Sequence, residues 1–292
     1  MIANRVIGVD LGGTKILAGV VDADGKVMGT VEHPTPTTST GALLDALEAA
    51  VTELLTPDIA AVGFGIPSRI DHRRGLVLGA VNIPVRDVNI LDEMGRRLGL
   101  PVAIENDANV AALAEFRFGA GRAYDGMVML TLGTGVGGGV VMDGRLYRGW
   151  AEFGHMVIVE DGEPCQGACT GRGHVESYCT GVAAGRVARR VLGPTATARD
   201  LVAQQHPALD EIGHHLGTAI GSLINIFNPH AVVIGGGFGI AAGELLLRPA
   251  RERIVREALA PAGEEVRLVL AELGKDAGLI GAGLIGLEAL SG

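Results

Sequence analysis

The feature that most restricts how this chain can fold is a plan of strand, glycine turn and strand that occurs twice. The first copy reads VIGVDLGGTKILAGVVDADGKV and the second reads MVMLTLGTGVGGGVVMDGRLY. Asp10 aligns with Thr131 at an offset of 121 residues, and Asp22 aligns with Asp143 at the same offset. Short apolar runs that flank glycine and Asp-Gly turns predict β-hairpins. The repeat therefore indicates an internal duplication, with two similar lobes whose hairpin turns face a shared cleft.

The segments outside the two hairpin copies alternate between helical and strand patterns. Glycine supplies 46 of the 292 residues, well above the average share of about 7%, and it lies in turns rather than in a linker. Ser39 and Thr40 precede leucines at helical spacing and are candidate helix caps. This alternation predicts an α/β fold with mixed sheets. We expect helices at 41–55, 108–118, 216–227, 244–258 and 278–290, and strands at 5–9, 59–66, 101–106, 231–234 and 266–270.

The composition argues against several classes of protein. The formal net charge of -9, from 33 acidic and 24 basic residues, is not that of a nucleic-acid-binding surface. No apolar run reaches the ~18 residues that a membrane-spanning helix needs. No charged segment followed by an apolar one precedes the first strand, so the pattern of a secretory signal is missing. We therefore expect a soluble cytoplasmic protein whose partners include neither nucleic acid nor membrane.

The first hairpin turn, Asp10-Leu-Gly-Gly-Thr-Lys15, combines a carboxylate, two glycines, a hydroxyl and an ammonium group. Glycines let backbone N–H groups approach phosphate oxygens without hindrance from Cβ atoms. A simple hairpin turn would explain the glycines, but it needs neither Asp10 nor Lys15. We therefore predict a phosphate-binding turn, and one of a different kind from a P-loop, because the sequence contains no G-x4-G-K-[ST].

The second hairpin turn contains a formal G-x-G-x-x-G at Gly133, Gly135 and Gly138. A dinucleotide-binding fold needs a helix immediately after these glycines, whereas VVMDG predicts a strand and a turn. A second phosphate-binding hairpin fits this context better. Two such turns, one in each lobe, indicate a nucleotide held across the cleft.

The run Glu105-Asn106-Asp107 ends a predicted strand and begins a predicted helix. Ligands of open α/β sheets bind at the carboxyl ends of the strands. Asp107 is the expected helix cap, and at the positive end of the helix dipole its carboxylate should stay ionised with a pKa near its usual value of ~3.9. An ionised Asp can still accept a hydroxyl proton during phosphoryl transfer.

Metal-ligand chemistry is concentrated in the glycine-rich segment from Glu152 to Glu176. Two thiols and two imidazoles lie within it, and such a set suits tetrahedral zinc. A pair of buried thiols or a local disulfide is the alternative. Free cysteine favours apolar surroundings, which this segment lacks, and nothing in the sequence indicates export to an oxidising compartment. The predicted zinc ligands are His155, Cys165, Cys169 and His174.

Six motifs, taken in order along the chain, resemble those of the ROK family of sugar kinases and repressors, and most of all its glucokinase branch. The resemblance covers essentially the whole chain. It implies the two-lobed, actin-like ATPase fold of the ribonuclease H type, with Mg·ATP as phosphoryl donor. The motifs are DLGGTK at 10–15, ENDAN at 105–109, TLGTGVGGG at 131–139, E-x-G-H at 152–155, the Cys/His segment ending at Glu176, and NPHAVVIGGG at 228–237.

The repeat places a boundary between the lobes near residue 112, and the resemblance implies a role for each motif. Residues 1–112 and the C-terminal helix 277–292 would form a small lobe, and residues 113–276 a large lobe with a zinc-binding segment at 155–174. Asp10 would lie near Mg²⁺, and Asp107 would be the general base for the O6 hydroxyl of the sugar. The ATP-binding residues would be Asp10, Gly12, Gly13, Thr14, Lys15, Thr134, Gly135, Gly235, Gly236 and Gly237, and the sugar-binding residues Asn106, Asp107, Glu152, His155 and Glu176.

This sequence departs from the family at the metal segment. The usual pattern resembles C-x-C-G-x-x-G-C-x-E, whereas here three residues separate Cys165 from Cys169, and His174 stands where the last cysteine usually is. Histidine is a sound replacement for thiolate in a zinc site. The altered gap makes Cys165 a less secure ligand than Cys169. The third cysteine, Cys179, is expected to pack in the core.

The expected activity is glucokinase, the transfer of the γ-phosphoryl group of ATP to O6 of glucose. Alternatives are a kinase for N-acetylmannosamine, N-acetylglucosamine, mannose or fructose, or an enzyme that uses polyphosphate. A sugar-responsive repressor would need a DNA-binding segment before the first strand, where we expect no room for one. The resemblance also implies a homodimer.

Overall fold

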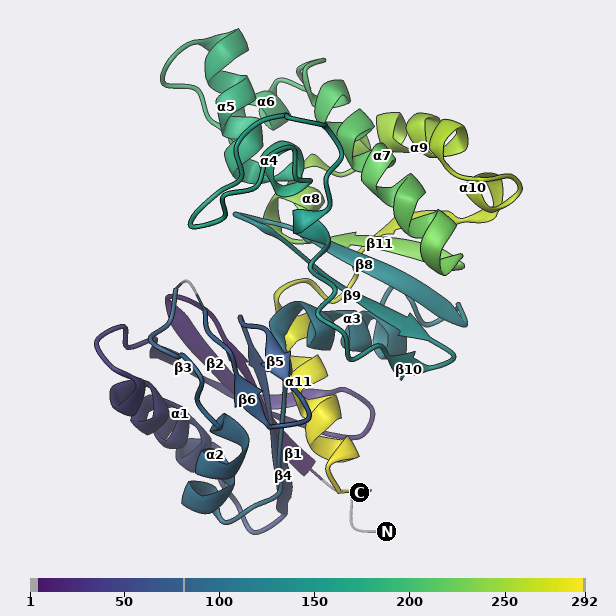
Figure 1. The fold of residues 1–292 in the computed structure, drawn as a ribbon. Helices are drawn as coiled ribbons and strands as arrows, with labels where there is room; N and C mark the ends of the chain where they lie inside the picture. Colours follow the sequence, from purple (N-terminus) through teal and green to yellow (C-terminus); the bar gives the residue numbers. More distant parts are fainter. Residues whose placement is uncertain (1–4, 81, 291–292) are drawn as a thin grey trace. The chain divides into compact units, whose positions relative to one another are not determined.

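The computed structural model describes residues 5–80 and 82–290. The chain forms two compact units (Figure 1). Their division assigns helix α3 (Asp107–Phe118) entirely to the first unit. The first unit comprises Met1–Gly119, Arg148–Trp150 and Lys275–Gly292, and the second comprises Ala120–Tyr147 and Ala151–Gly274.

The first unit is built on a five-stranded sheet with the order β3-β2-β1-β4-β7. In this sheet β2 runs antiparallel to both β1 and β3, whereas β4 runs parallel to both β1 and β7. The strands are β1 (Arg5–Leu11), β2 (Lys15–Val21), β3 (Val27–Pro34), β4 (Ile59–Ile66) and β7 (Val102–Asn106), and a separate short hairpin contains β5 (Ile70–Asp71) and β6 (Leu76–Val77).

The second unit repeats this sheet, with the order β10-β9-β8-β11-β12 and the same sequence of antiparallel and parallel pairs. The repeat extends to single positions, because Asp10 on β1 lies beside Gly65 of its parallel neighbour and Thr131 on β8 lies beside Gly235 of its own. The predicted duplication is therefore confirmed. The strands are β8 (Gly126–Leu132), β9 (Val136–Met142), β10 (Arg145–Leu146), β11 (Ala231–Gly235) and β12 (Arg267–Leu270).

The two faces of the first sheet are covered in different ways. Side chains of a strand alternate between faces, and the apolar ones, such as Ile7 and Phe64, pack against α1 (Thr40–Leu54) and α2 (Ile90–Leu98). On the opposite face Gly63 gives room to α11 (Ala277–Glu288), because a Cβ atom there would collide with the carbonyl oxygen of Ala282. Figure 1 shows α1 and α2 on one side of this sheet and α3 and α11 on the other.

Several predicted helix ends are confirmed. The side chain of Ser39 accepts a hydrogen bond from Ala42 N at the start of α1. Asn228 adopts the left-handed conformation at the end of α7 (Leu209–Phe227), immediately before Pro229. α7 begins two turns earlier than the expected residue 216. Its first turns bury Leu209 and Ile212, but polar residues such as His214 interrupt the apolar pattern there in the sequence. The remaining helices of the second unit are η1 (Phe153–His155), α4 (Glu176–Cys179), α5 (Gly181–Leu192), α6 (Ala198–Ala203), α8 (Gly237–Ala242), α9 (Glu244–Glu257), α10 (Ala262–Glu265) and η2 (Gly274–Asp276), although η2 ends in the first unit.

None of the helices within residues 5–80 and 82–290 combines the length and the apolar character needed to cross a membrane.

Candidate functional site

In the first unit, the start of α3 is held by Asn106. Asn106 Oδ1 accepts hydrogen bonds from the backbone N–H groups of Ala108 (2.9 Å) and Asn109 (3.1 Å). Its Nδ2 donates to the carbonyl oxygen of Ser68 at 3.2 Å. The prediction that Asp107 is the helix cap is therefore wrong, because Asn106 occupies that position and Asp107 is the first residue of the helix. Because Oδ1 accepts two hydrogen bonds and Nδ2 donates one, the side chain of Asn106 is held in a fixed orientation.

The carboxylate of Asp107 is closely surrounded by protein, and this burial raises its pKa above the ordinary value of 3.8. Hydrogen bonds from Ala108 N, which lies 2.8 Å from Asp107 Oδ1, and from Asn106 lower the pKa without reversing the shift. The expectation of an unperturbed pKa is therefore wrong, because loss of water around the carboxylate outweighs its hydrogen bonds. A carboxylate of raised pKa is a better proton acceptor at neutral pH.

Asp10 lies near the end of β1 in the same unit. Burial, and then the negative charge of Asp107, raise the pKa of Asp10 to about 6, while Lys15 lowers it. Lys15 is directed to a surface ion pair, with its Nζ 2.8 Å from Glu32 Oε2. Asp10 and Asp107 thus form an acidic region that a divalent cation would stabilise, and oxygen ligands of this kind suit Mg²⁺.

The turn between β1 and β2 is held from behind by Thr35, a buried residue that sequence reasoning did not identify. Thr35 Oγ1 donates to the carbonyl oxygen of Gly12 at 2.7 Å, and its N–H donates to the carbonyl oxygen of Thr14 at 3.0 Å. The turn closes on itself through Gly12 N, which donates to Lys15 O. No sequence signal marks Thr35, because its partners are backbone carbonyl groups 20 or more residues away.

In the second unit, residues of three predicted groups lie together around the turn from β8 to β9. Glu176 Oε2 accepts a hydrogen bond from Val136 N at 3.0 Å, and a Cβ atom at Gly135 would lie 2.5 Å from the same oxygen. Gly236, with a φ of 78°, packs so closely on Leu132 that a Cβ atom would lie 2.5 Å from its backbone. The structure thus brings the glycines at 133–135 and 235–237 together with Glu176. The rejection of a dinucleotide fold is confirmed, because strand β9, which begins at Val136 and includes Gly138, occupies the place where that fold needs a helix.

The four predicted zinc ligands form one cluster, in which one ligand atom from each residue lies within 4.8 Å of the others. Nδ1 of His155 lies 3.3 Å from Nδ1 of His174 and 3.9 Å from Sγ of Cys165, and Sγ of Cys169 lies 3.7 Å from Nδ1 of His174. Tetrahedral zinc, with bonds of about 2.05 Å to nitrogen and 2.3 Å to sulfur, would give roughly 3.3 Å between nitrogens and 3.6 Å from nitrogen to sulfur. The geometry therefore fits zinc, and it includes Cys165 despite the altered gap.

The thiols of this cluster are free, so the disulfide alternative is excluded. Burial and the neighbouring Cys169 raise the pKa of the Cys165 thiol, which is the condition that a bound cation would reverse. Cys179 lies in the core, where burial raises the pKa of its thiol beyond the usual range. Cys179 is therefore the packing residue that was expected.

One predicted sugar-binding residue, His155, belongs to the cluster, and another, Glu176, lies beside it. Glu152 precedes η1, and His155 ends it with an exposed side chain. The Nδ1 atom of His155 faces the other ligands, which leaves Nε2 as the nitrogen available to a second partner. Glu176 Oε1 lies 4.0 Å from Cys165 Sγ. Within the second unit, the metal cluster therefore includes His155 and adjoins Glu176.

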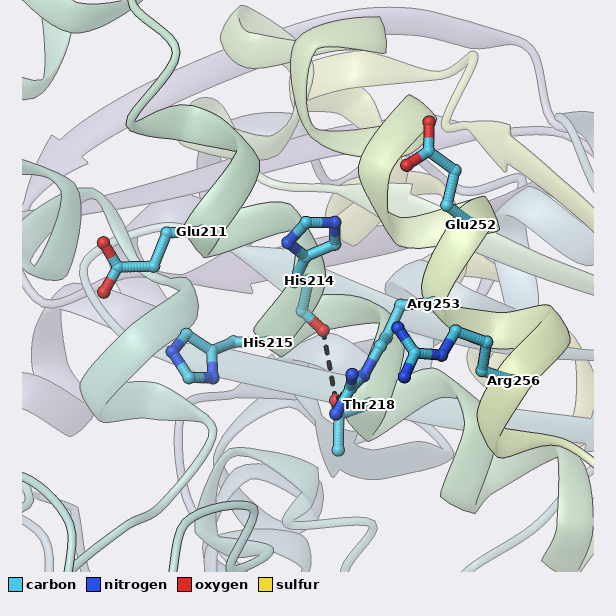
Figure 2. Close-up of a pocket in the computed structure, with 7 residues that line it drawn as sticks. All are labelled: Glu211, His214, His215, Thr218, Glu252, Arg253 and Arg256. Carbon is cyan, nitrogen blue, oxygen red and sulfur yellow. Dashed lines mark hydrogen bonds between the residues drawn. The ribbon is translucent and has the colours of Figure 1, made fainter.

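A separate hollow of about 560 Å³ lies between α7 and α9, and none of the predicted site residues line it (Figure 2). The ring of His215 stacks on Tyr178 at 4.4 Å, and burial lowers the His215 pKa. Arg253 Nε donates to Thr218 Oγ1 at 3.1 Å. Because these groups already have partners, the hollow offers no reactive set comparable with the residues above.

Comparison with known proteins agrees with this arrangement. Residues 6–288 match the ROK family. The chain is 37% identical to a glucokinase of Streptomyces coelicolor, covering 94% of this chain and 95% of that protein. It is 35% identical to a glucokinase of Thermotoga maritima, covering 99% of each.

A solved structure of a ROK family glucokinase from Streptomyces griseus, in complex with glucose and AMPPNP, superposes with a TM-score of 0.82 at 36% identity. The match covers 98% of this chain and 100% of that one. Together with the two duplicated sheets, this similarity shows the actin-like ATPase fold that the motifs implied. The chain belongs to the ROK family.

Proposed function

We propose that this chain is an ATP-dependent glucokinase that transfers the γ-phosphoryl group of Mg·ATP to O6 of glucose. The observation that carries the proposal is the carboxylate of Asp107, which is anchored at the start of α3 and has a raised pKa, in a chain 37% identical to a glucokinase. A general base needs a fixed position and a pKa closer to the working pH than that of an exposed carboxyl group. Asp107 meets both requirements.

In the proposed reaction, Asp107 accepts the proton of the O6 hydroxyl as the oxygen forms its bond to the γ-phosphorus. The bond from the γ-phosphorus to the bridging oxygen of ADP breaks, and ADP leaves with the electron pair. The products are ADP, glucose 6-phosphate and a proton that passes from Asp107 to solvent. The N–H groups of the turns at 12–14 and 133–135 bind phosphate oxygens and hold the γ-phosphoryl group in place.

Mg²⁺, when bound at Asp10, would neutralise part of the phosphate charge. The fit rests on Asp10, a partly buried carboxylate whose pKa is raised by burial and then by the negative charge of Asp107. A cation at Asp10 would offset this repulsion and leave Asp107 as the proton acceptor for the sugar hydroxyl.

Sugar recognition is proposed for Asn106 and Asp107 of the first unit and for Glu152, His155 and Glu176 of the second. A hexose hydroxyl both donates and accepts, so carboxylates, an amide and an imidazole suit it well. A site that bonds each hydroxyl rejects analogues that lack one, by up to ~10⁴–10⁵ in favourable cases. Nε2 of His155 is the atom that its other contacts leave for the sugar.

The cluster of His155, Cys165, Cys169 and His174 is proposed to hold a structural zinc ion. A site closed by four protein ligands has no open position for catalysis. We propose that the zinc ion fixes the segment that carries His155 and Glu176, and so orients both side chains.

We further propose that the two units act as the small and large lobes of the kinase, and that the protein works as a cytoplasmic homodimer in carbohydrate metabolism. The acidic formal charge of -9 supports the absence of a nucleic-acid partner.

A coupled assay across sugars and donors tests the proposal. The purified protein is given ATP or polyphosphate with glucose, mannose, fructose, N-acetylglucosamine or N-acetylmannosamine, and ADP or sugar phosphate is measured. We expect the highest kcat/KM for glucose with ATP. A higher value for another sugar, or activity only with polyphosphate, would reject the proposed substrate pair.

A further inference from the structure

Glu105 is a nearly fully buried acidic residue, 1% exposed, that has no role in the proposed chemistry. It precedes Asn106 and Asp107 in the chain. Its Oε1 accepts hydrogen bonds from Asn106 N at 2.9 Å and from Asn109 Nδ2 at 3.0 Å. A carboxylate so far from water is costly unless hydrogen bonds or an opposite charge stabilise it. The burial of Glu105 is therefore explained by the groups that its carboxylate binds.

His72 faces the other oxygen of this carboxylate. Its Nε2 lies 3.2 Å from Glu105 Oε2, within ion-pair distance. Oε2 accepts no hydrogen bond of regular geometry from any described residue, so the contact with His72 is a close approach and not an aligned hydrogen bond. The His72 side chain is 25% exposed and that of Glu105 is 2% exposed. His72 thus lies between the buried carboxylate and solvent.

The groups that Glu105 holds are those that orient the start of α3. Asn106 receives the Glu105 contact on its backbone and caps the helix with its side chain. Asn109 lies one turn further on, and its Nδ2 also approaches the carbonyl oxygen of Gly149 at 3.5 Å. One carboxylate oxygen therefore fixes both the residue before Asp107 and the first turn after it.

We infer that Glu105, oriented by His72, is a positioning residue that sets the direction of Asn106 and Asp107 toward the sugar. The inference rests on the proposed sugar kinase function. Glu105 itself contacts no reacting atom. Its removal should act through the sugar and leave the binding of ATP, which uses other turns, almost unchanged.

The test compares four variants at Glu105 and His72 by steady-state kinetics and thermal unfolding. Glu105→Ala removes both acceptors, and we expect kcat/KM for the sugar to fall by roughly 10- to 100-fold, as for a displacement of about 1 Å in a catalytic group, with KM for ATP unchanged. Glu105→Gln keeps an acceptor oxygen at the same reach and should retain nearly all of the activity. Glu105→Asp keeps the charge but shortens the side chain, so it should behave like Glu105→Ala, and it replaces that variant if Glu105→Ala does not fold.

His72→Ala tests the second half of the pair. We expect a smaller loss of the same kind. No further loss is expected when His72→Ala is added to Glu105→Ala, or to Glu105→Asp if that variant replaces it, because the two residues act through one carboxylate. Full additivity of the two losses would contradict the role given to His72.

Glu115→Ala is the matched control, since Glu115 is also buried, at 0% exposure, and lies on α3, two turns beyond Asp107. We expect Glu115→Ala to lower the melting temperature without a selective change in the sugar parameters. If Glu105→Ala and Glu105→Asp gave only this pattern, or raised KM for ATP and for the sugar alike, Glu105 would be merely structural.

The proposed function is tested separately, by the wild-type protein alone. If it fails to phosphorylate glucose, the glucokinase assignment fails. The comparison of Glu105 variants is then made with the sugar that the panel identifies, and the same selective loss is expected.

Discussion

Replacing Asp107 with Asn separates the chemistry of this residue from its place in the fold. The amide keeps an oxygen that can accept the hydrogen bond from Ala108 N, which lies 2.8 Å from Oδ1. It cannot take up a proton at neutral pH. Loss of a general base lowers kcat by about 10²–10⁴, which is about 3–5 kcal/mol of activation free energy.

The same substitution should leave stability unchanged or increase it. A carboxylate in the first turn of a helix contributes about 0.3–1 kcal/mol through the helix dipole, and Asn would lose this. The raised pKa shows, however, that burial disfavours the ionised form of Asp107 even with its hydrogen bonds in place. A neutral amide removes that cost, so the burial effect should equal or exceed the dipole effect.

The assay measures kcat, KM for glucose and melting temperature for Asp107→Asn beside the wild type. Asp92→Asn is the matched control, because Asp92 lies in the first turn of α2 in the same unit and has no proposed role in the reaction. The control should keep wild-type kinetics. Turnover of Asp107→Asn within a few-fold of wild type would refute the assignment of the base, and a marked loss of stability would refute the argument from burial.

Three further predictions concern pH, metal and packing. The base must be deprotonated, and burial raises the Asp107 pKa, so the acid limb of kcat/KM for glucose should lie above the ordinary value of 3.8. Activity should be lost as the pH falls through the raised pKa, and a profile that stays flat down to the ordinary carboxyl range would contradict this. Metal analysis should find one zinc per chain in the wild type and in Cys179→Ala, but little zinc in Cys169→Ser. Cys169→Ser should also have a higher KM for glucose. Zinc-free wild-type protein with full activity would rule out the structural site. Gly63→Ala should lower the unfolding free energy by about 1–3 kcal/mol or more, because the added Cβ atom forces α11 away. Denaturant unfolding compares it with Gly29→Ala, whose Cβ atom meets open space in the same sheet, and equal stability of the two variants would show that α11 can move freely.

The helices and strands that could be predicted from sequence are those with an uninterrupted pattern. The strand at 59–66 agrees to the residue, and the helix expected at 244–258 differs from α9 by one residue at its end. α7 was placed too late because a polar run with two histidines interrupts its apolar spacing, although Leu209 and Ile212 are buried. Helices α2 and α5 were not predicted, although the apolar residues of each lie on one side of the helix, so the sequence did contain a signal for them.

The candidate site divides in the same way. The zinc cluster was predicted from residue types within one segment, since metal ligands are few and chemically distinctive. The exchange of roles between Asn106 and Asp107 could not be predicted, because either side chain can cap a helix and only the geometry shows which one does. Thr35 and Glu105 were missed as functional supports, because each acts on groups that folding brings to it.

The sequence by itself determined the duplication, the glycine turns and the set of acidic, cysteine and histidine residues, because turn chemistry and ligand chemistry are local properties of the chain. Only the tertiary structure decided the raised pKa of Asp107 and the setting of Glu105. Burial raises the pKa of Asp107, and Glu105 is approached by His72, which lies 33 residues earlier in the sequence. Electrostatic effects of this kind depend on the water and the partners around a group, and a linear sequence specifies neither until the chain has folded.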